Sequence, residues 1–259
     1  MRSSLLALTL LAGVAAAAPA SAQTVAALVG DDTLVHVDAA AGKAVKTVKV
    51  TGVSGKLLGI DVRPADGMLY GVASDGSVVM IDPQSGAATV KSKLDTMLPN
   101  GVMATIDFNP AADRLRIIGS DGTNLRANVD DGKVTKDGML KFADADQMKG
   151  KTPKVVAGAY TNSMKGAKET ALFDIDATGA VLKQAPPNDG VLNTVGMMGM
   201  ASETVAFDIA SDGQGGNSAW AMVGSKLYKV DLVSGKGTES GAIQGVSGTV
   251  RDIAILPKM

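Results

Sequence analysis

A recurring turn signal is the feature that most constrains this sequence. Apolar residues lead to an aspartate, and a short turn that ends in glycine follows. The spacings between the successive aspartates are 44, 48, 46 and 55 residues. The five are Asp38, Asp82, Asp130, Asp176 and Asp231. A period in the forties with several strands per unit is typical of β-propeller blades, which stack around an axis because one small sheet cannot bury both faces alone.

The segment from residue 57 to residue 86 shows the repeating unit. Apolar stretches at 57–62, 68–73 and 78–81 alternate with turns rich in Asp, Gly and Pro. Strands and turns at this spacing are typical of antiparallel sheets. Helix-like stretches are short, so the sequence favours an all-β fold over an α/β fold.

The two ends of the chain predict how the propeller closes. Gly248–Leu256 reads as a first strand without partners, and Val25–Val37 supplies partners without a first strand. One blade shared between both ends would close the ring and remove the open edge. We therefore predict five blades, with a sixth as the alternative if residues 137–156 contain a further short sheet.

The first 22 residues are expected to be a secretory signal peptide rather than part of the fold. Arg2 precedes an apolar run, and Ala20-Ser21-Ala22 provides a cleavage signal of small residues. The alternative, a membrane anchor, would need a longer apolar run. Residues 23–259 then form one exported domain, periplasmic or extracellular. Because the chain has no cysteine, thiol catalysis and Cys-based zinc sites are excluded.

Charge and residue content exclude several further classes. With 25 Lys and Arg against 26 Asp and Glu, the chain gives no indication of a nucleic-acid or anionic-membrane partner. His36 is the only histidine and no G-x-S-x-G motif exists, which disfavours a transition-metal site and a Ser-His-Asp triad. No cofactor, no metal, no membrane span and a monomeric state are expected.

Acidic residues recur near the first strand of four blades. They are Asp61, Asp107, Asp208 and Asp252. Inner strands border the axial channel, so these carboxylates would converge there, as glycoside hydrolysis by a carboxylate pair requires. The alternative, which we favour, is that each makes the same structural hydrogen bond in its own blade.

The third blade has an unusual face of Arg and Asn. Six such residues fall within twenty positions: Asn109, Arg114, Arg116, Asn124, Arg126 and Asn128. Residues two apart on a strand point to the same side of the sheet. This face either binds an anionic or polyol ligand through its forked donors, or is a solvated surface paired with nearby aspartates.

Five ordered segments of this chain resemble a known family: Gly59–Gly71, Ile106–Arg116, Asn124–Gly132, Ala159–Ser163 and Gln184–Gly196. The family is exported, mostly bacterial and catalogued as domain of unknown function 4394. The resemblance implies a propeller-like repeat domain with no assigned activity. It also favours a shared polar ligand site over a solvated face. The matching polar positions are Arg63, Asn109, Arg114, Arg116, Asn124, Arg126, Asn162, Asn188 and Asp189.

Together these features predict a binding or scaffolding module without evident catalytic machinery. Its expected partner is a small polar or anionic ligand, or another exported protein. One alternative is a carboxylate-dependent glycoside hydrolase or lyase that uses the axial channel. The other is a structural component of the envelope or a biofilm.

Overall fold

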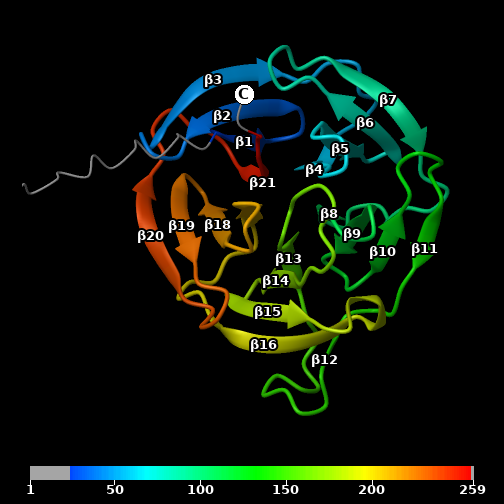
Figure 1. Ribbon diagram of the computed structural model, residues 1–259, viewed down its shortest axis with the longest axis vertical. Coiled ribbons are helices and arrows are strands. Elements are labelled where there is room, and N and C mark those ends of the chain that lie inside the picture. The colour runs from blue at the N-terminus through cyan, green and yellow to red at the C-terminus, as the bar shows by residue number, and fades with distance from the viewer. Residues whose placement is uncertain (1–23, 258–259) are drawn as a thin grey trace, which may run out of the picture.

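The computed structural model describes residues 24–257 and shows five small sheets arranged as blades around a central axis (Figure 1). The five-bladed, all-β prediction is confirmed. The expected signal peptide lies outside the described residues. Within them, the only helix is a single 3₁₀ turn, η1 (Pro187–Asp189). No helix in residues 24–257 is long and apolar enough to cross a membrane.

Each sheet runs from an inner strand at the axis to an outer strand at the rim. Blade one contains β21 (Val250–Ile255), β1 (Thr24–Val29), β2 (Thr33–Asp38) and β3 (Lys43–Lys49). Blade two contains β4 (Leu57–Val62), β5 (Leu69–Ala73), β6 (Ser77–Ile81) and β7 (Ala88–Lys93). Blade three contains β8 (Ala104–Asn109), β9 (Arg114–Gly119), β10 (Asn124–Ala127) and β11 (Val134–Lys136).

The last two blades differ in size. Blade four contains β13 (Val155–Tyr160), β14 (Leu172–Asp176), β15 (Ala180–Gln184), β16 (Val191–Met197) and β12 (Lys141–Phe142). Blade five contains β17 (Ala206–Ser211), β18 (Asn217–Val223), β19 (Lys226–Val230) and β20 (Gly237–Ala242). The short β12 pairs in parallel with β16, so the segment 137–156 extends blade four instead of forming another sheet. The six-blade alternative is therefore wrong.

Strands from the two ends of the chain close the ring as predicted. β1 pairs with β2 on one side and with β21 on the other, and Ala26 lies between His36 and Ala254 in this register. The inner strand of blade one therefore comes from the C-terminal end, and the remaining three come from the N-terminal end. Pairing both ends of the chain in one sheet leaves no unpaired inner strand.

The turn signal has a physical explanation in contacts between blades. Asp82 Oδ1 accepts hydrogen bonds from the backbone N–H groups of Gln84 and Ser85, and Gly86 then adopts a φ of 76°. A Cβ at Gly86 would overlap the carbonyl oxygen of Lys49 in the preceding blade. Glycine is needed there for its positive φ and for this close approach.

In blade three the turn signal is shifted relative to the sequence interpretation. Asn128, not Asp130, holds the turn, because Asn128 Oδ1 accepts from the N–H of Asp130 and the Asn128 carbonyl accepts from Gly132. The side chain of Asp130 is thereby released to bind Arg63. The assignment of Asp130 as the repeat aspartate is wrong, since asparagine and aspartate both support such turns.

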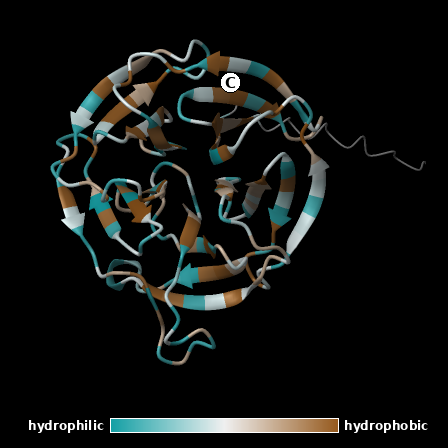
Figure 2. Cartoon of the chain, turned by 180° about the vertical axis from the view of Figure 1, so that it is seen from behind, coloured by the Kyte–Doolittle hydropathy of each residue, from teal (hydrophilic) through white to brown (hydrophobic). Residues whose placement is uncertain are grey.

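Five apolar clusters, one between each pair of neighbouring blades, form the core of the described residues. Between blades two and three, Tyr70 and Phe108 pack edge to face with ring centroids 5.4 Å apart. Hydrophobic residues gather in the strands, whereas most connecting loops are pale or hydrophilic (Figure 2). The outer strands β3 and β7 are largely exposed and carry several lysines, which discourages pairing with another chain.

Candidate functional site at the propeller axis

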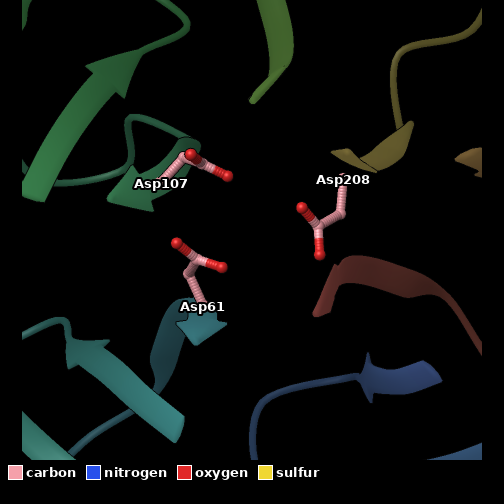
Figure 3. A group of neighbouring side chains, drawn as sticks. All are labelled: Asp61, Asp107 and Asp208. Atoms are coloured by element: carbon pink, nitrogen blue, oxygen red, sulfur yellow. The ribbon is translucent and has the colours of Figure 1, made fainter. Parts of the chain in front are cut away.

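Four inner strands each place one buried carboxylate at the axis. Asp61, Asp107, Asp208 and Asp252 are all no more than 5% exposed, and they come from β4, β8, β17 and β21. The side chains of Asp61, Asp107 and Asp208 point toward one another across the axis (Figure 3). One oxygen from each of these three lies within 4.8 Å of the other two.

Hydrogen bonds to neighbouring inner strands hold these carboxylates in place. Asp61 Oδ2 accepts from the N–H of Phe108, at 2.7 Å, and Asp107 Oδ1 accepts from Tyr160, at 2.9 Å. Asp208 Oδ2 accepts a hydrogen bond from the backbone N–H of Ile255 in the same way. Each bond crosses to the next blade, so the acids tie the inner ring together.

Asp252 completes the set of ties, since its Oδ2 accepts from the N–H of Ile60 at 3.0 Å. Asp61, Asp208 and Asp252 each use their second oxygen to accept from the N–H of the following residue. A structural role within each blade is therefore present, as the sequence interpretation favoured, and it coexists with convergence at the axis.

Asp107 differs from the other three acids. Its Oδ1 accepts from Tyr160, but its Oδ2 has no hydrogen-bond partner within residues 24–257. The remaining axial carboxylate oxygens all accept backbone hydrogen bonds. The structural role thus uses only one of the two carboxylate oxygens of Asp107.

Burial and mutual repulsion raise the pKa of the axial acids. Burial raises the pKa of Asp208 to about 6. Burial, reinforced by the negative charges of the neighbouring acids, raises the pKa of Asp61 and Asp107 well above the usual range. In the described part of the chain, no Lys or Arg forms an ion pair with these three carboxylates. These groups therefore hold protons more readily than ordinary aspartates, and no ion pair within residues 24–257 balances them when they ionise.

A cavity of about 540 Å³ connects this site to the surface. It lies where β4, β17 and β21 end, and both Asp61 and Asp208 line it. Ser163 and Met164, from the Lys-containing loop after β13, form part of its wall. A small ligand entering this mouth would reach two of the three converging carboxylates.

Two loops at the mouth are fastened to each other by a reciprocal pair of hydrogen bonds. The N–H of Asn162 donates to Asn217 Oδ1, and Asn217 Nδ2 donates to Asn162 Oδ1. Asn162 has a φ of 56°, a backbone conformation that asparagine tolerates better than most residues. The predicted site residue Asn162 therefore shapes the rim of the cavity, and its partner Asn217 was not anticipated.

Arg63 lies in a separate network between blades two and three. It is 7% exposed, and its guanidinium donates to both oxygens of Asp113 and to Asp130. The same contacts hold the pKa of Asp130 at about 2. Residues 50 and 67 positions away supply these partners, so spacing along the sequence does not indicate them.

Arg116 lies in a second network, between blades three and four. It is 2% exposed and donates to Asn124 Oδ1, to Asn188 Oδ1 and, at 2.5 Å, to Asp137 Oδ2. Arg126 donates to both oxygens of the same Asp137. Asp137, which the sequence analysis did not identify, is therefore the residue that joins both predicted arginines.

The remaining predicted residues lie apart from these networks. Asn109 Oδ1 accepts from two backbone N–H groups of its own turn, and Arg114 donates to the carbonyls of Ala112 and Asp113. Asp189 ends the 3₁₀ turn η1 and is exposed. The nine predicted positions thus form several clusters, and a common ligand site for all of them stays a prediction.

A family model described as "Domain of unknown function (DUF4394)" matches residues 33–254. The chain belongs to this family. The expected family resemblance is thereby confirmed over most of the DUF4394 propeller. No curated protein matches its sequence.

The DUF4394 propeller is similar to several solved structures at low sequence identity. A protein of unknown function from Bacteroides thetaiotaomicron VPI-5482 is 17% identical with a TM-score of 0.53, over 92% of this chain and 65% of that one. A protein of unknown function from Bacteroides caccae is 10% identical with a TM-score of 0.46, over 92% of this chain and all of that one. The computationally designed Ika8 protein is 14% identical with a TM-score of 0.38, over 86% and 60% respectively.

Proposed function

We propose that this DUF4394 propeller is an exported binding module that holds a positively charged group at its axis. Export is supported by the apolar run and the small-residue cleavage signal before Gln23. The binding role is supported by the propeller architecture and by the axial cavity. The charged group is either a metal ion or the ammonium of a small molecule.

One observation carries the proposal. Three buried carboxylates from three blades converge at the axis, two of them line a cavity that opens to solvent, and no Lys or Arg of the described chain forms an ion pair with them. Removing carboxylates from water without a counter-charge is unfavourable, and the groups respond either by taking up protons or by binding a cation. Asp107 Oδ2, which accepts no hydrogen bond from residues 24–257, is the one oxygen of the three acids that the backbone does not already use.

The spacing of the oxygens suits a hard cation. Calcium binds carboxylate oxygens at about 2.3–2.6 Å. Three oxygens that lie within 4.8 Å of one another leave room for one point close to those distances from all three. The cavity allows water or a ligand atom to complete the coordination.

The test is a titration of the folded, chelator-treated chain from residue 23 onward. Calcium, magnesium and a small alkylammonium salt are compared by calorimetry and thermal melting at pH 7.5. We expect one of them to bind and to raise the melting temperature, because a ligand specific to the native state stabilises it.

Two variants make the titration specific. Asp107→Asn keeps an oxygen for the Tyr160 N–H but removes the unpartnered carboxylate oxygen, and should weaken binding at least about tenfold. Asp144→Asn removes a carboxylate whose side chain is 99% exposed, and should bind as the wild type does. Equal binding by both variants, or no binding of any cation by the folded wild type, rules out the axial cation site.

Glycoside hydrolysis at the axis is a second candidate. The convergence of the acids and the raised pKa of Asp208, about 6, favour it, since a general acid must keep its proton near neutral pH. The carboxyl groups of retaining enzymes lie about 5 Å apart, which is comparable with the spacing at the axis. Release of reducing sugar from a panel of polysaccharides, lost in Asp208→Asn and kept in Asp144→Asn, would establish it. A folded protein that releases none between pH 5 and 7 is not such a hydrolase.

A further inference from the structure

The outer part of the blade-three face differs from its inner part. On the inner part, blade four covers Arg116 and Asn124, and both are at most 2% exposed. On the outer part, Arg114, Arg126 and Asn128 are only partly buried. These outer side chains line a hollow of about 200 Å³ together with residues of β11 and the preceding turn.

Strand register brings the donors of this hollow together. Arg126 lies opposite Thr135 of β11 and opposite Arg116 of β9, so these three share one row across the sheet. Arg114 lies two residues before Arg116 and shares its face. The backbone N–H of Asn128 donates to the carbonyl of Lys133, which places Lys133 beside Asn128 at the next position along the sheet.

Several donors in the hollow have no protein partner among residues 24–257. Arg114 uses only Nη1, and its Nε and Nη2 make no hydrogen bond to the described chain. Arg126 uses Nε and Nη2 on Asp137 and leaves Nη1. Lys133 forms no ion pair there. Forked guanidinium donors and an ammonium are the groups that proteins use to bind oxyanions.

The charge of the face is positive. Arg116, Arg126, Arg114 and Lys133 are opposed by two carboxylates, Asp137, which pairs with Arg116 and Arg126, and Asp131, which also lines the hollow. Asp137 holds Arg126 by a bidentate pair, so this donor is positioned before any ligand arrives. Preorganisation of this kind lowers the conformational cost of binding.

We infer that the hollow formed by Arg114, Arg126, Asn128, Lys133 and Thr135 binds a small oxyanion, free or as the acid group of a larger ligand. This site has the opposite charge preference to the axis and lies on a different part of blade three. It does not rest on the proposed axial function. A propeller with both sites would hold a cationic and an acidic group at two separate places.

The experiment titrates the isotope-labelled, folded chain with sodium sulfate, with sodium phosphate and with sodium glucuronate. Sodium chloride keeps the ionic strength constant, and backbone amide signals report the place of binding. We expect saturable changes at residues of β9, β10 and β11. Binding of the inorganic ions alone indicates a free oxyanion, and tighter binding of glucuronate indicates an acidic sugar.

Variants of the two outer cations test the assignment. Arg114→Ala and Lys133→Ala should each weaken the affinity by about tenfold, since each removes a charge-assisted contact. The matched control is Lys136→Ala on β11, because Lys136 lies opposite the buried Leu125 and so faces the other side of the sheet. Lys136→Ala should bind as the wild type does, and so should Asp107→Asn, which separates this site from the axial one.

Three results would overturn the inference. The first is unchanged affinity in both Arg114→Ala and Lys133→Ala. The second is a set of amide changes that maps outside blade three. The third is a response that chloride reproduces at equal concentration, which would mean general screening of surface charge.

Discussion

Buried charge is handled in opposite ways at the interface of blades three and four and at the axis. At the interface, Arg116 meets Asp137, Asn124 and Asn188, so its charge and donors are matched inside the protein. At the axis, carboxylates meet one another and backbone N–H groups, and no ion pair balances them. The first region is a network in which two arginines share one buried carboxylate, and the second is a group of acids without a cationic partner in residues 24–257 that opens to a cavity.

The contrast shows how a polar cluster is assigned to stability or to binding. A group whose partners are all supplied by the chain contributes to the fold, because removing it leaves those partners buried and unpaired. A group whose charge the chain leaves unbalanced lowers stability until a proton or ligand arrives. Charged groups are therefore expected to raise stability at the interface of blades three and four and to lower it at the axis.

The largest effect is expected from breaking the interface network. Arg116→Met removes the more deeply buried of the two arginine partners of Asp137, whose side chain is only 5% exposed, and leaves Asn124 and Asn188 without their donor. We expect the free energy of unfolding to fall by about 3–5 kcal/mol, the usual range for breaking a buried ion pair. Urea unfolding measures it.

Arg114→Met is the control for this experiment. It lies on the same strand but donates only to backbone carbonyls near the surface, and should change stability by less than about 0.5 kcal/mol. Similar losses in the two variants would contradict the distinction between inner and outer parts of the face.

The second-largest effect is a dependence of stability on pH at the axis, where it is the charged form of a buried group that lowers stability. The folded-state pKa of Asp208, about 6, lies above the value of 3.8 for an ordinary aspartate. The unfolded chain therefore releases this proton first, and stability present below pH 4 is lost as the pH rises to about 6. For one such group the loss is about 3 kcal/mol.

Urea unfolding of the chelator-treated protein at pH 4 and pH 6 measures this slope, with Asp208→Asn as the comparison. His36 acts in the other direction, because burial lowers its pKa and stability is lost as the pH falls through that range. The difference between wild type and Asp208→Asn cancels the contribution of His36, which both contain, and measures Asp208 together with its effect on the neighbouring acids Asp61 and Asp107. Identical slopes would show that Asp208 is ionised in the folded protein at pH 4.

A smaller effect tests whether geometry as well as charge matters in the arginine networks. Arg63→Lys keeps the positive charge between blades two and three but cannot contact both oxygens of Asp113 and reach Asp130 at once. We expect unfolding to become easier by about 1–2 kcal/mol. Chemical denaturation of Arg63→Lys measures this change, with Arg114→Lys as the control. Equal stability of the two variants would mean that charge alone suffices at Arg63.

The architecture was accessible from the sequence because its signals are local and repeated. The Asp-to-Gly turns, the period in the forties and the unmatched strands at the two ends predicted five blades closed by β21 and β1. The pattern predicted the wrong turn residue in blade three, where Asn128 holds the turn and Asp130 pairs with Arg63. Local chemistry of the turn tolerates that exchange, so the sequence pattern does not distinguish the two positions.

The site was only partly accessible. The sequence placed Asp61, Asp107 and Asp208 on inner strands, but whether their oxygens meet depends on the stagger between blades, which no local signal specifies. The pairing of Arg116 and Arg126 with Asp137 was missed, because it is formed by a turn between blades rather than by residues on the same strands. Long-range partners of this kind need three-dimensional contacts to identify them.

The pairing of β21 with β1 also sets an order of assembly. Synthesis reaches β21 after every other strand, and β21 carries both Asp252 and the Ile255 N–H that holds Asp208. A nascent chain whose β21 has not yet been synthesised therefore lacks Asp252 and the N–H group that binds Asp208. The other four blades already have all their strands at that point. The axial site is therefore complete only once β21 has paired with β1, and a product truncated before β21 would lack a properly held Asp208 even if most of its blades had folded.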